Sequence, residues 1–207
     1  MLDLAKVHSE KLNISISYAV ITPDEYRFEN KMYDTYYILS ETNPFIGNKV
    51  VQEVSNKKGI AFVAIYPSVN MKKNNLLFES FKSNYLYSTY YQEQIMKKII
   101  PMLERQYRLN KNVENKSIIG INNLAMMSYT IAHDYTTSFY HVYSINLNIK
   151  PYKAEFMAYY KSKLDQSVEL LIKSDDVKEL KDIAVMFGSM SFKELEVNNL
   201  NDLILSL

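Results

Sequence analysis

The residues with the clearest chemical potential lie where a short apolar run meets a helical pattern. Ser117–Ile121 reads SIIGI and predicts a strand, and Leu124–Ala132 has the spacing of a helix. A polar side chain at such a sharp strand-to-helix turn stands exposed above a sheet, where some enzymes place a nucleophile. Asn122 occupies this turn. Its carboxamide attacks esters poorly, so Asn122 is either a ligand-binding amide or a residue that tolerates left-handed backbone geometry.

Other catalytic groups are scarce. The sequence has no cysteine, which excludes disulfides, thiol nucleophiles and cysteine-zinc sites. The three histidines are His8, His133 and His141, and no two of them have the spacing of a helical zinc site. We therefore expect no metal and no cofactor. His133 ends a predicted helix and His141 lies in a predicted strand, so structural roles are favoured over the alternative of a catalytic base.

The composition limits the classes of partner that the protein is expected to bind. Four glycines in 207 residues is about 2%, against roughly 7% in average proteins, and no phosphate-binding glycine loop is present. The net charge of +1 argues against nucleic acid as a partner. No apolar run is long enough to span a membrane, and the first residues do not resemble a signal peptide. The expected location is the cytoplasm, without a membrane partner.

The elements around the turn alternate between strands and helices. The predicted strands are Leu12–Ile21, Tyr33–Leu39, Ile60–Ile65, Ser117–Ile121 and Phe139–Leu147. The predicted helices are Asn48–Asn56, Tyr87–Tyr107 and Leu124–Ala132, and Pro101 should kink the second or end its regular part. This alternation predicts βαβ units and a mostly parallel sheet, the α/β class.

The C-terminal quarter has a less regular pattern. Its predicted helices are Ala154–Leu164, Ser167–Lys173, one from Val177 and the tail Asn201–Leu207, and its predicted strand is Ile183–Phe187. No linker or repeat divides the chain. We therefore expect one domain over residues 1–207.

Several segments together resemble the esterase D-like branch of the α/β-hydrolases, which includes S-formylglutathione hydrolases and feruloyl and tributyrin esterases. They are IIPMLERQY (Ile99–Tyr107), NKSIIG leading into Gly120–Leu124, the N-terminal SEKLNISISYAVITPDEY and YDTYYIL, and IAVMFGSMSF (Ile183–Phe192). The resemblance implies a three-layer sandwich around a mostly parallel sheet. It also implies that the domain is truncated at its C-terminus and lacks the family's last strand.

The resemblance places the family's catalytic positions on residues that have changed. Asn122 stands where the family has the nucleophilic serine, Gly120 and Asn123 flank it, and Leu124 replaces a glycine. Ser40 and Glu41 replace the oxyanion His-Gly motif, and a carboxylate there would repel a developing oxyanion. Ser191 stands at the position of the acid, and no histidine follows His141 to act as the base.

These departures favour a catalytically inactive esterase-like protein with a binding, scaffolding or regulatory role. Its partner would be a protein or a small molecule. One alternative is a carboxylic-ester hydrolase with a remodelled site that uses Asp175 or Asp176, a histidine, and Ser128 or Ser191. An open pocket above Asn122 would favour that alternative, whereas a pocket plugged by Leu124, Met126 or the 66–85 loop would favour inactivity.

A second alternative is a structural subunit of a homo-oligomer. Without a further strand, Ile183–Phe187 would form an exposed edge of the sheet. Proteins rarely leave such an edge bare. The sequence therefore predicts that either the C-terminal tail or a second copy of the chain covers it.

Overall fold

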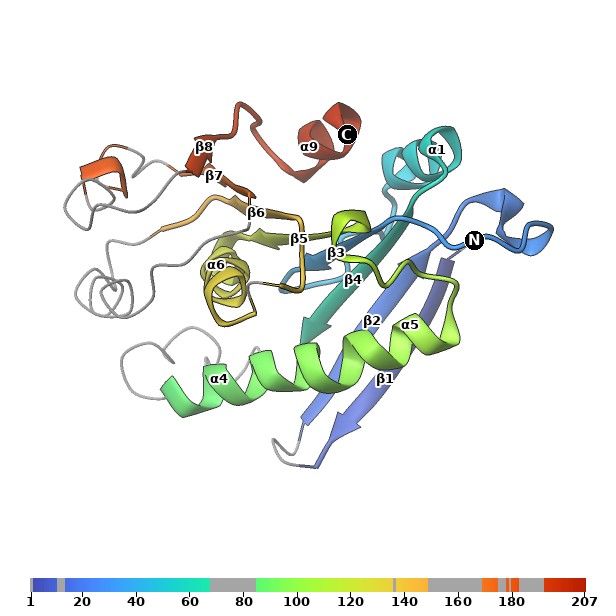
Figure 1. Ribbon diagram of the computed structural model, residues 1–207, viewed down its shortest axis with the longest axis horizontal. Helices are drawn as coiled ribbons and strands as arrows, with labels where there is room; N and C mark the ends of the chain where they lie inside the picture. The colour runs from blue at the N-terminus through green and yellow to red at the C-terminus, as the bar shows by residue number, and fades with distance from the viewer. Residues whose placement is uncertain are drawn as a thin grey trace.

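The computed structural model describes residues 2–10, 14–67, 85–135, 137–148, 169–174, 178, 180–182 and 192–207. These residues form an eight-stranded sheet with the order β1-β2-β4-β3-β5-β6-β7-β8 (Figure 1). Its strands are β1 Leu2–Ser9, β2 Ile14–Ile21, β3 Thr35–Leu39, β4 Ala61–Pro67, β5 Lys116–Ile121, β6 His141–Ile145, β7 Glu169–Lys173 and β8 Phe192–Glu194. The β1–β2 and β2–β4 pairs are antiparallel, and all other pairs are parallel. The predicted α/β class with a mostly parallel sheet is confirmed.

Helices cover both faces of this sheet. On one face lie α4 (Tyr85–Gln94), α5 (Ile100–Gln106) and α6 (Ala125–Asp134). On the other lie α1 (Lys49–Lys58) and α9 (Leu200–Ser206), as Figure 1 shows. The predicted three-layer sandwich is therefore confirmed. Among the described residues, no helix combines the length and the hydropathy needed to cross a membrane.

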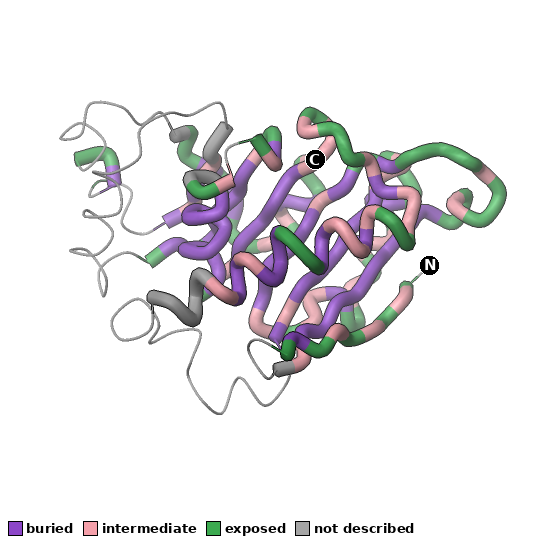
Figure 2. Tube along the Cα trace, turned by 60° about the horizontal axis from the view of Figure 1, so that its bottom comes forward, coloured by how far each residue is buried: buried purple, intermediate pink, exposed green. Residues whose placement is uncertain are grey.

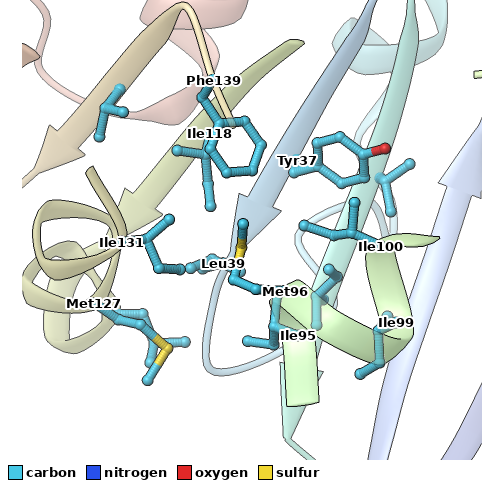
Figure 3. Packing of buried hydrophobic residues seen from close by; sticks show 14 of the residues in the cluster. Tyr37, Leu39, Ile95, Met96, Ile99, Ile100, Ile118, Met127, Ile131 and Phe139 are labelled. Carbon is cyan, nitrogen blue, oxygen red and sulfur yellow. The ribbon is translucent and has the colours of Figure 1, made fainter. Parts of the chain in front are cut away.

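The central strands carry the core. Figure 2 shows nearly continuous burial along them, in contrast to the exposed loops. On the face of α5 and α6, Leu39 of β3 and Ile118 of β5 lie in one apolar cluster with Ile99, Met127 and Ile131 of the covering helices (Figure 3). Burial of each such side chain contributes about 1.5–3 kcal/mol. This packing fixes the strands whose ends form the site.

Pro101 changes the pitch of its helix. The segment Ile95–Ile99 between α4 and α5 is π-helical, and Pro101 occupies the first turn of α5 directly after it. Proline lacks the N–H that would continue an α-helical ladder, and a local π-turn is one way to absorb that loss. The regular α-helix ends before Pro101, as predicted.

In the C-terminal quarter, the structure contradicts one predicted element and describes few of the others. The predicted helix over Ser167–Lys173 is wrong, because Glu169–Lys173 pairs with β6 as β7. Its apolar centre is too short for periodicity to separate a buried strand from a helix. The predictions for Ala154–Leu164 and Ile183–Phe187 lie outside the described residues.

The described sheet ends at a strand that the sequence did not predict. The short strand β8 pairs with β7 and is the last strand of the sheet in the described part of the chain. The tail predicted at Asn201–Leu207 is helical, and it packs beside α1 on one face of the sheet. The predicted cover of an edge at Ile183–Phe187, by the tail or by a second copy, concerns residues outside the described part of the chain and stays a prediction.

Candidate functional site

A pocket of about 410 Å³ opens at the carboxyl ends of β3, β5 and β6. In parallel α/β sheets, ligands bind in crevices beyond this end of the strands. The lining residues are Ser40, Glu41, Thr42, Pro44, Asn48, Ile121, Asn122, Ile145, Asn146, Asn199, Leu200 and Asn201. The sequence-predicted positions Ser40, Glu41 and Asn122 are thus brought together in one pocket.

The sharp strand-to-helix turn is retained. β5 ends at Ile121, a 3-10 turn spans Asn122–Leu124, and α6 begins at Ala125. Asn122 has a φ of +53°, in the left-handed region that few side chains other than asparagine accept readily. The turn prediction for Asn122 is therefore confirmed in its geometry, and the residue presents its side chain at the pocket.

Gly120 supports this turn from below. A Cβ atom at Gly120 would lie 2.3 Å from Ser128 Oγ and 2.4 Å from the carbonyl oxygen of Leu124. The glycine is needed because α6 approaches β5 so closely. Leu124 points into the core and is buried. Leu124, which the family resemblance places at a glycine position, is therefore not among the described lining residues of the pocket, and Met126 is likewise buried in the core cluster.

Asn122 and Asn146 form an amide pair across the pocket floor. Asn146 Nδ2 donates to Asn122 Oδ1 at 2.9 Å. Asn146 follows β6 directly and has a φ of +58°. Within the described part of the chain, these two are the only non-glycine residues with positive φ. Unusual backbone conformations of this kind gather at functional sites.

Glu41 lines the pocket in the loop after β3, where the family resemblance places the oxyanion motif. In the related hydrolases, the oxyanion hole uses the backbone N–H after the nucleophile and another from the loop after the third strand. Here those two segments meet through side chains, because Asn123 Nδ2 donates to Glu41 Oε1 at 2.5 Å. Ser40 Oγ donates to the carbonyl oxygen of Thr42 at 2.6 Å. A carboxylate therefore occupies the neighbourhood where a developing oxyanion would need donors.

The last part of the chain forms the remaining wall. After β8, the chain runs to Asn199, which caps α9 by accepting from Asp202 N at 3.1 Å. Two residues further along the chain, Asn201 Oδ1 accepts a hydrogen bond from Asn48 Nδ2 at 2.7 Å. This bond links α9 to the start of α1. The segment at the start of α9 thus lines the pocket with asparagines.

The histidines lie elsewhere. His141 begins β6, at the opposite end of that strand from Asn146, and its ring packs edge-on against Tyr140. His8 is exposed on the edge strand β1. His133 belongs to α6, near the end of that helix. No histidine lines the pocket among the described residues.

The other candidate nucleophiles and acids divide into two groups. Ser128 is completely buried, and its hydroxyl contacts Ser144 Oγ at 2.9 Å and donates to the carbonyl oxygen of Ala125 at 2.9 Å. It is a support of the turn and is inaccessible to a substrate. Ser191, Asp175 and Asp176 lie outside the described residues. In sequence, both aspartates follow the carboxyl end of β7 within three residues.

The sequence did not predict the role of four asparagines that line the pocket: Asn48, Asn146, Asn199 and Asn201. The sequence around each of these asparagines indicates only a local structural role. Asn146 follows a predicted strand, while Asn48 and Asn199 directly precede helices, where asparagine is a common cap. Topology alone brings them to one pocket. Within the described ranges, no three histidine, cysteine or carboxylate side chains are grouped as a metal site.

Comparisons with known proteins identify the fold. No family model matches the sequence, and no curated protein matches it. A ferulic acid esterase structure superposes with a TM-score of 0.71 and 15% identity over 100% of this chain and 94% of that chain. FphF, a fluorophosphonate-binding serine hydrolase of Staphylococcus aureus, gives 0.65 and 15% over 94% and 89%. S-formylglutathione hydrolase (FrmB) from the same organism gives 0.65 and 14% over 94% and 89%. The chain therefore has the fold of the esterase D-like α/β-hydrolases.

Proposed function

We propose that this chain is a catalytically inactive esterase-like protein that binds a small polar ligand in the pocket at Asn122. The observation that carries the proposal is the pairing of Glu41 with Asn123 beside a turn that holds asparagine at the nucleophile position. The site keeps the backbone of a hydrolase turn while its chemical groups are those of a binding site.

The nucleophile step lacks its group. A serine elbow works because a base removes the hydroxyl proton as the oxygen attacks. The Asn122 amide offers no such oxygen, and its Oδ1 already accepts from Asn146. No histidine lines the described pocket to act as a base.

The pocket would oppose the formation of an oxyanion rather than stabilise it. Loss of a single oxyanion donor in a serine hydrolase lowers kcat by about 10²–10³. Here the side chain that faces Asn123 is a carboxylate, whose negative charge repels a tetrahedral oxyanion. Restoring the nucleophile alone would leave this obstacle in place.

The binding role rests on the open pocket. The plug expected for a dead site is absent at Leu124 and Met126, because both side chains pack in the core cluster instead. The third expected plug, the 66–85 loop, lies outside the described residues over positions 68–84. Pockets with a few converging polar groups are the usual small-molecule sites of proteins. The side chains of the amide pair and of Glu41 supply such groups here.

The test is the purified protein with short-chain acyl esters and with a serine-reactive fluorophosphonate probe. We expect no turnover above the buffer rate and no labelling. Turnover that disappears in Asn122→Ala would refute the proposal, since that result would place catalysis at this turn.

A sharper form of the test uses Asn122→Ser. An unassisted serine hydroxyl is a weak nucleophile, so this variant should remain inactive. Its folding should be checked by circular dichroism against the unchanged chain. Rapid labelling of Asn122→Ser by the fluorophosphonate would show that a base is present after all.

A remodelled ester hydrolase is the second candidate, and the same open pocket favours it. The order of strands adds to this case, because Asp175 and Asp176 follow β7 in sequence and could contribute an acid. Of the two serines that this candidate function could use, Ser128 is excluded because it is buried. Loss of measured turnover in an Asp175→Asn, Asp176→Asn double variant would support this candidate.

A further inference from the structure

Among the described residues that line the pocket, one side chain, Glu41, is ionisable. Its neighbours are amides, hydroxyls and the apolar side chains of Pro44, Ile121, Ile145 and Leu200. No aromatic ring is among the described lining residues. Glu41 therefore gives the described part of the pocket a negative charge among uncharged groups.

Glu41 keeps binding capacity of its own. Its Oε1 accepts from Asn123 Nδ2, and within the described residues the other carboxylate oxygen has no hydrogen-bond partner. No lysine, arginine or histidine of the described part forms an ion pair with it. A carboxylate can accept several hydrogen bonds. One pocket oxygen is therefore available for a charged donor.

The amides around Glu41 are also partly unused. Asn122 uses its Oδ1 and Asn146 its Nδ2, which leaves the Nδ2 of the first and the Oδ1 of the second without partners in the described structure. Asn48 uses only its Nδ2, to reach Asn201 and the carbonyl oxygen of Pro44. The pocket thus presents both donors and acceptors beside one anionic oxygen.

We propose that the pocket binds small organic ammonium compounds that also carry hydroxyl or carbonyl groups, with the ammonium group on Glu41. This inference rests on the proposed binding function and names its ligand class. Hydrogen bonds to charged groups contribute more than neutral ones. Anionic compounds are disfavoured by the same carboxylate, and a volume of about 410 Å³ admits a molecule of hexose size.

Three hexoses of matched size test the charge preference. Titration calorimetry would compare glucosamine, glucose and glucuronate at a pH where the amine is protonated and the acid is ionised. We expect glucosamine to bind about tenfold more tightly than glucose, the effect of one charged hydrogen bond. Glucuronate should bind most weakly.

Two variants separate Glu41 from the overall charge of the protein. Glu41→Gln should lower the affinity for glucosamine about tenfold, to that for glucose. Glu53→Gln, an equal change on the exposed face of α1, should leave all three affinities unchanged. If Glu41→Gln does not fold, added salt should weaken glucosamine binding by the unchanged chain and leave glucose binding constant.

Equal affinity for glucosamine and glucose, stronger binding of glucuronate, or binding of none of the three would overturn the inference. None of these results bears on catalysis. Ester turnover at Asn122 would instead overturn the proposed function, so the two failures are distinguishable.

Discussion

The two ends of the parallel strands hold their polar side chains in different ways. At the amino end, Lys116 Nζ lies 3.1 Å from Glu104 Oε1, and each side chain is only 11% exposed. Tyr37 Oη donates to the same carboxylate oxygen at 3.4 Å. At the carboxyl end, Asn122 and Asn146 are exposed and hydrogen-bond to each other.

This difference separates stability from binding. Burial, together with the Glu104 carboxylate, raises the pKa of Tyr37 well above its ordinary value, so the tyrosine stays a neutral donor within the core. At the amino end, Lys116 and Glu104 are therefore paired in a setting that resembles a packed interior. The carboxyl end keeps left-handed turns and partly unused amides facing a pocket. A fold can lose catalytic groups at the second end without weakening the first.

The largest expected effect follows from Gly120, which carries the turn at the pocket end. Gly120→Ala places a Cβ against the Leu124 backbone and the buried Ser128 hydroxyl. Because both neighbours are held in place, we expect a loss of about 3 kcal/mol in the free energy of unfolding, at the upper end for overpacking. Chemical denaturation would measure it.

Gly47→Ala is the matched control. Gly47 also has positive φ, at +71°, but its Cβ would meet nothing within 4 Å. Only the backbone cost remains, about 1 kcal/mol. Equal losses in the two variants would mean that Ser128 moves aside, and that the pocket end lacks the rigid support described above.

The next effect probes the amino end. Lys116→Met leaves the Glu104 carboxylate largely buried and without its cation, which should cost about 2 kcal/mol. The double variant with Glu104→Leu should recover most of this loss, because well-packed apolar pairs can replace buried ion pairs. Lys97→Met, which breaks an exposed pair with Glu93, should cause no measurable change.

A comparison with the pocket end completes this test. Asn146→Ala removes an exposed amide and places alanine at a φ of +58°, a cost of about 1 kcal/mol, so it should still destabilise the protein less than Lys116→Met. If Asn146→Ala cost as much, the pocket end would be as important for stability as the amino end, and the separation of roles would be wrong.

Most of the fold was predictable because its central strands are short β-branched or aromatic runs between clear helices. β7 was misread because its apolar centre is too short to show a period. β1 was not predicted at all. Its outer side chains, Leu2, Leu4, Lys6 and His8, are exposed, so the segment lacks the apolar alternation of a buried strand.

The site was predictable only where sequence order fixes it. Asn122 and Glu41 could be placed because the family resemblance assigns each to a position that follows a predicted strand. Asn48 and Asn201 are 153 positions apart and meet only because α9 packs beside α1. No local sequence pattern predicts that contact, so the asparagines that line the pocket could be identified only from the structure.

The smallest expected effect decides why asparagine stands at position 122. If the backbone conformation dominates, Asn122→Ala should cost about 1 kcal/mol, because alanine resists a φ of +53°, while Asn122→Gly should change stability by less than about 0.5 kcal/mol. Both variants lose the hydrogen bond to Asn146. Equal losses in thermal unfolding would therefore point to that bond instead. In either case, weaker glucosamine binding by Asn122→Gly would show that the amide also serves the ligand, since glycine keeps the turn and removes only the side chain.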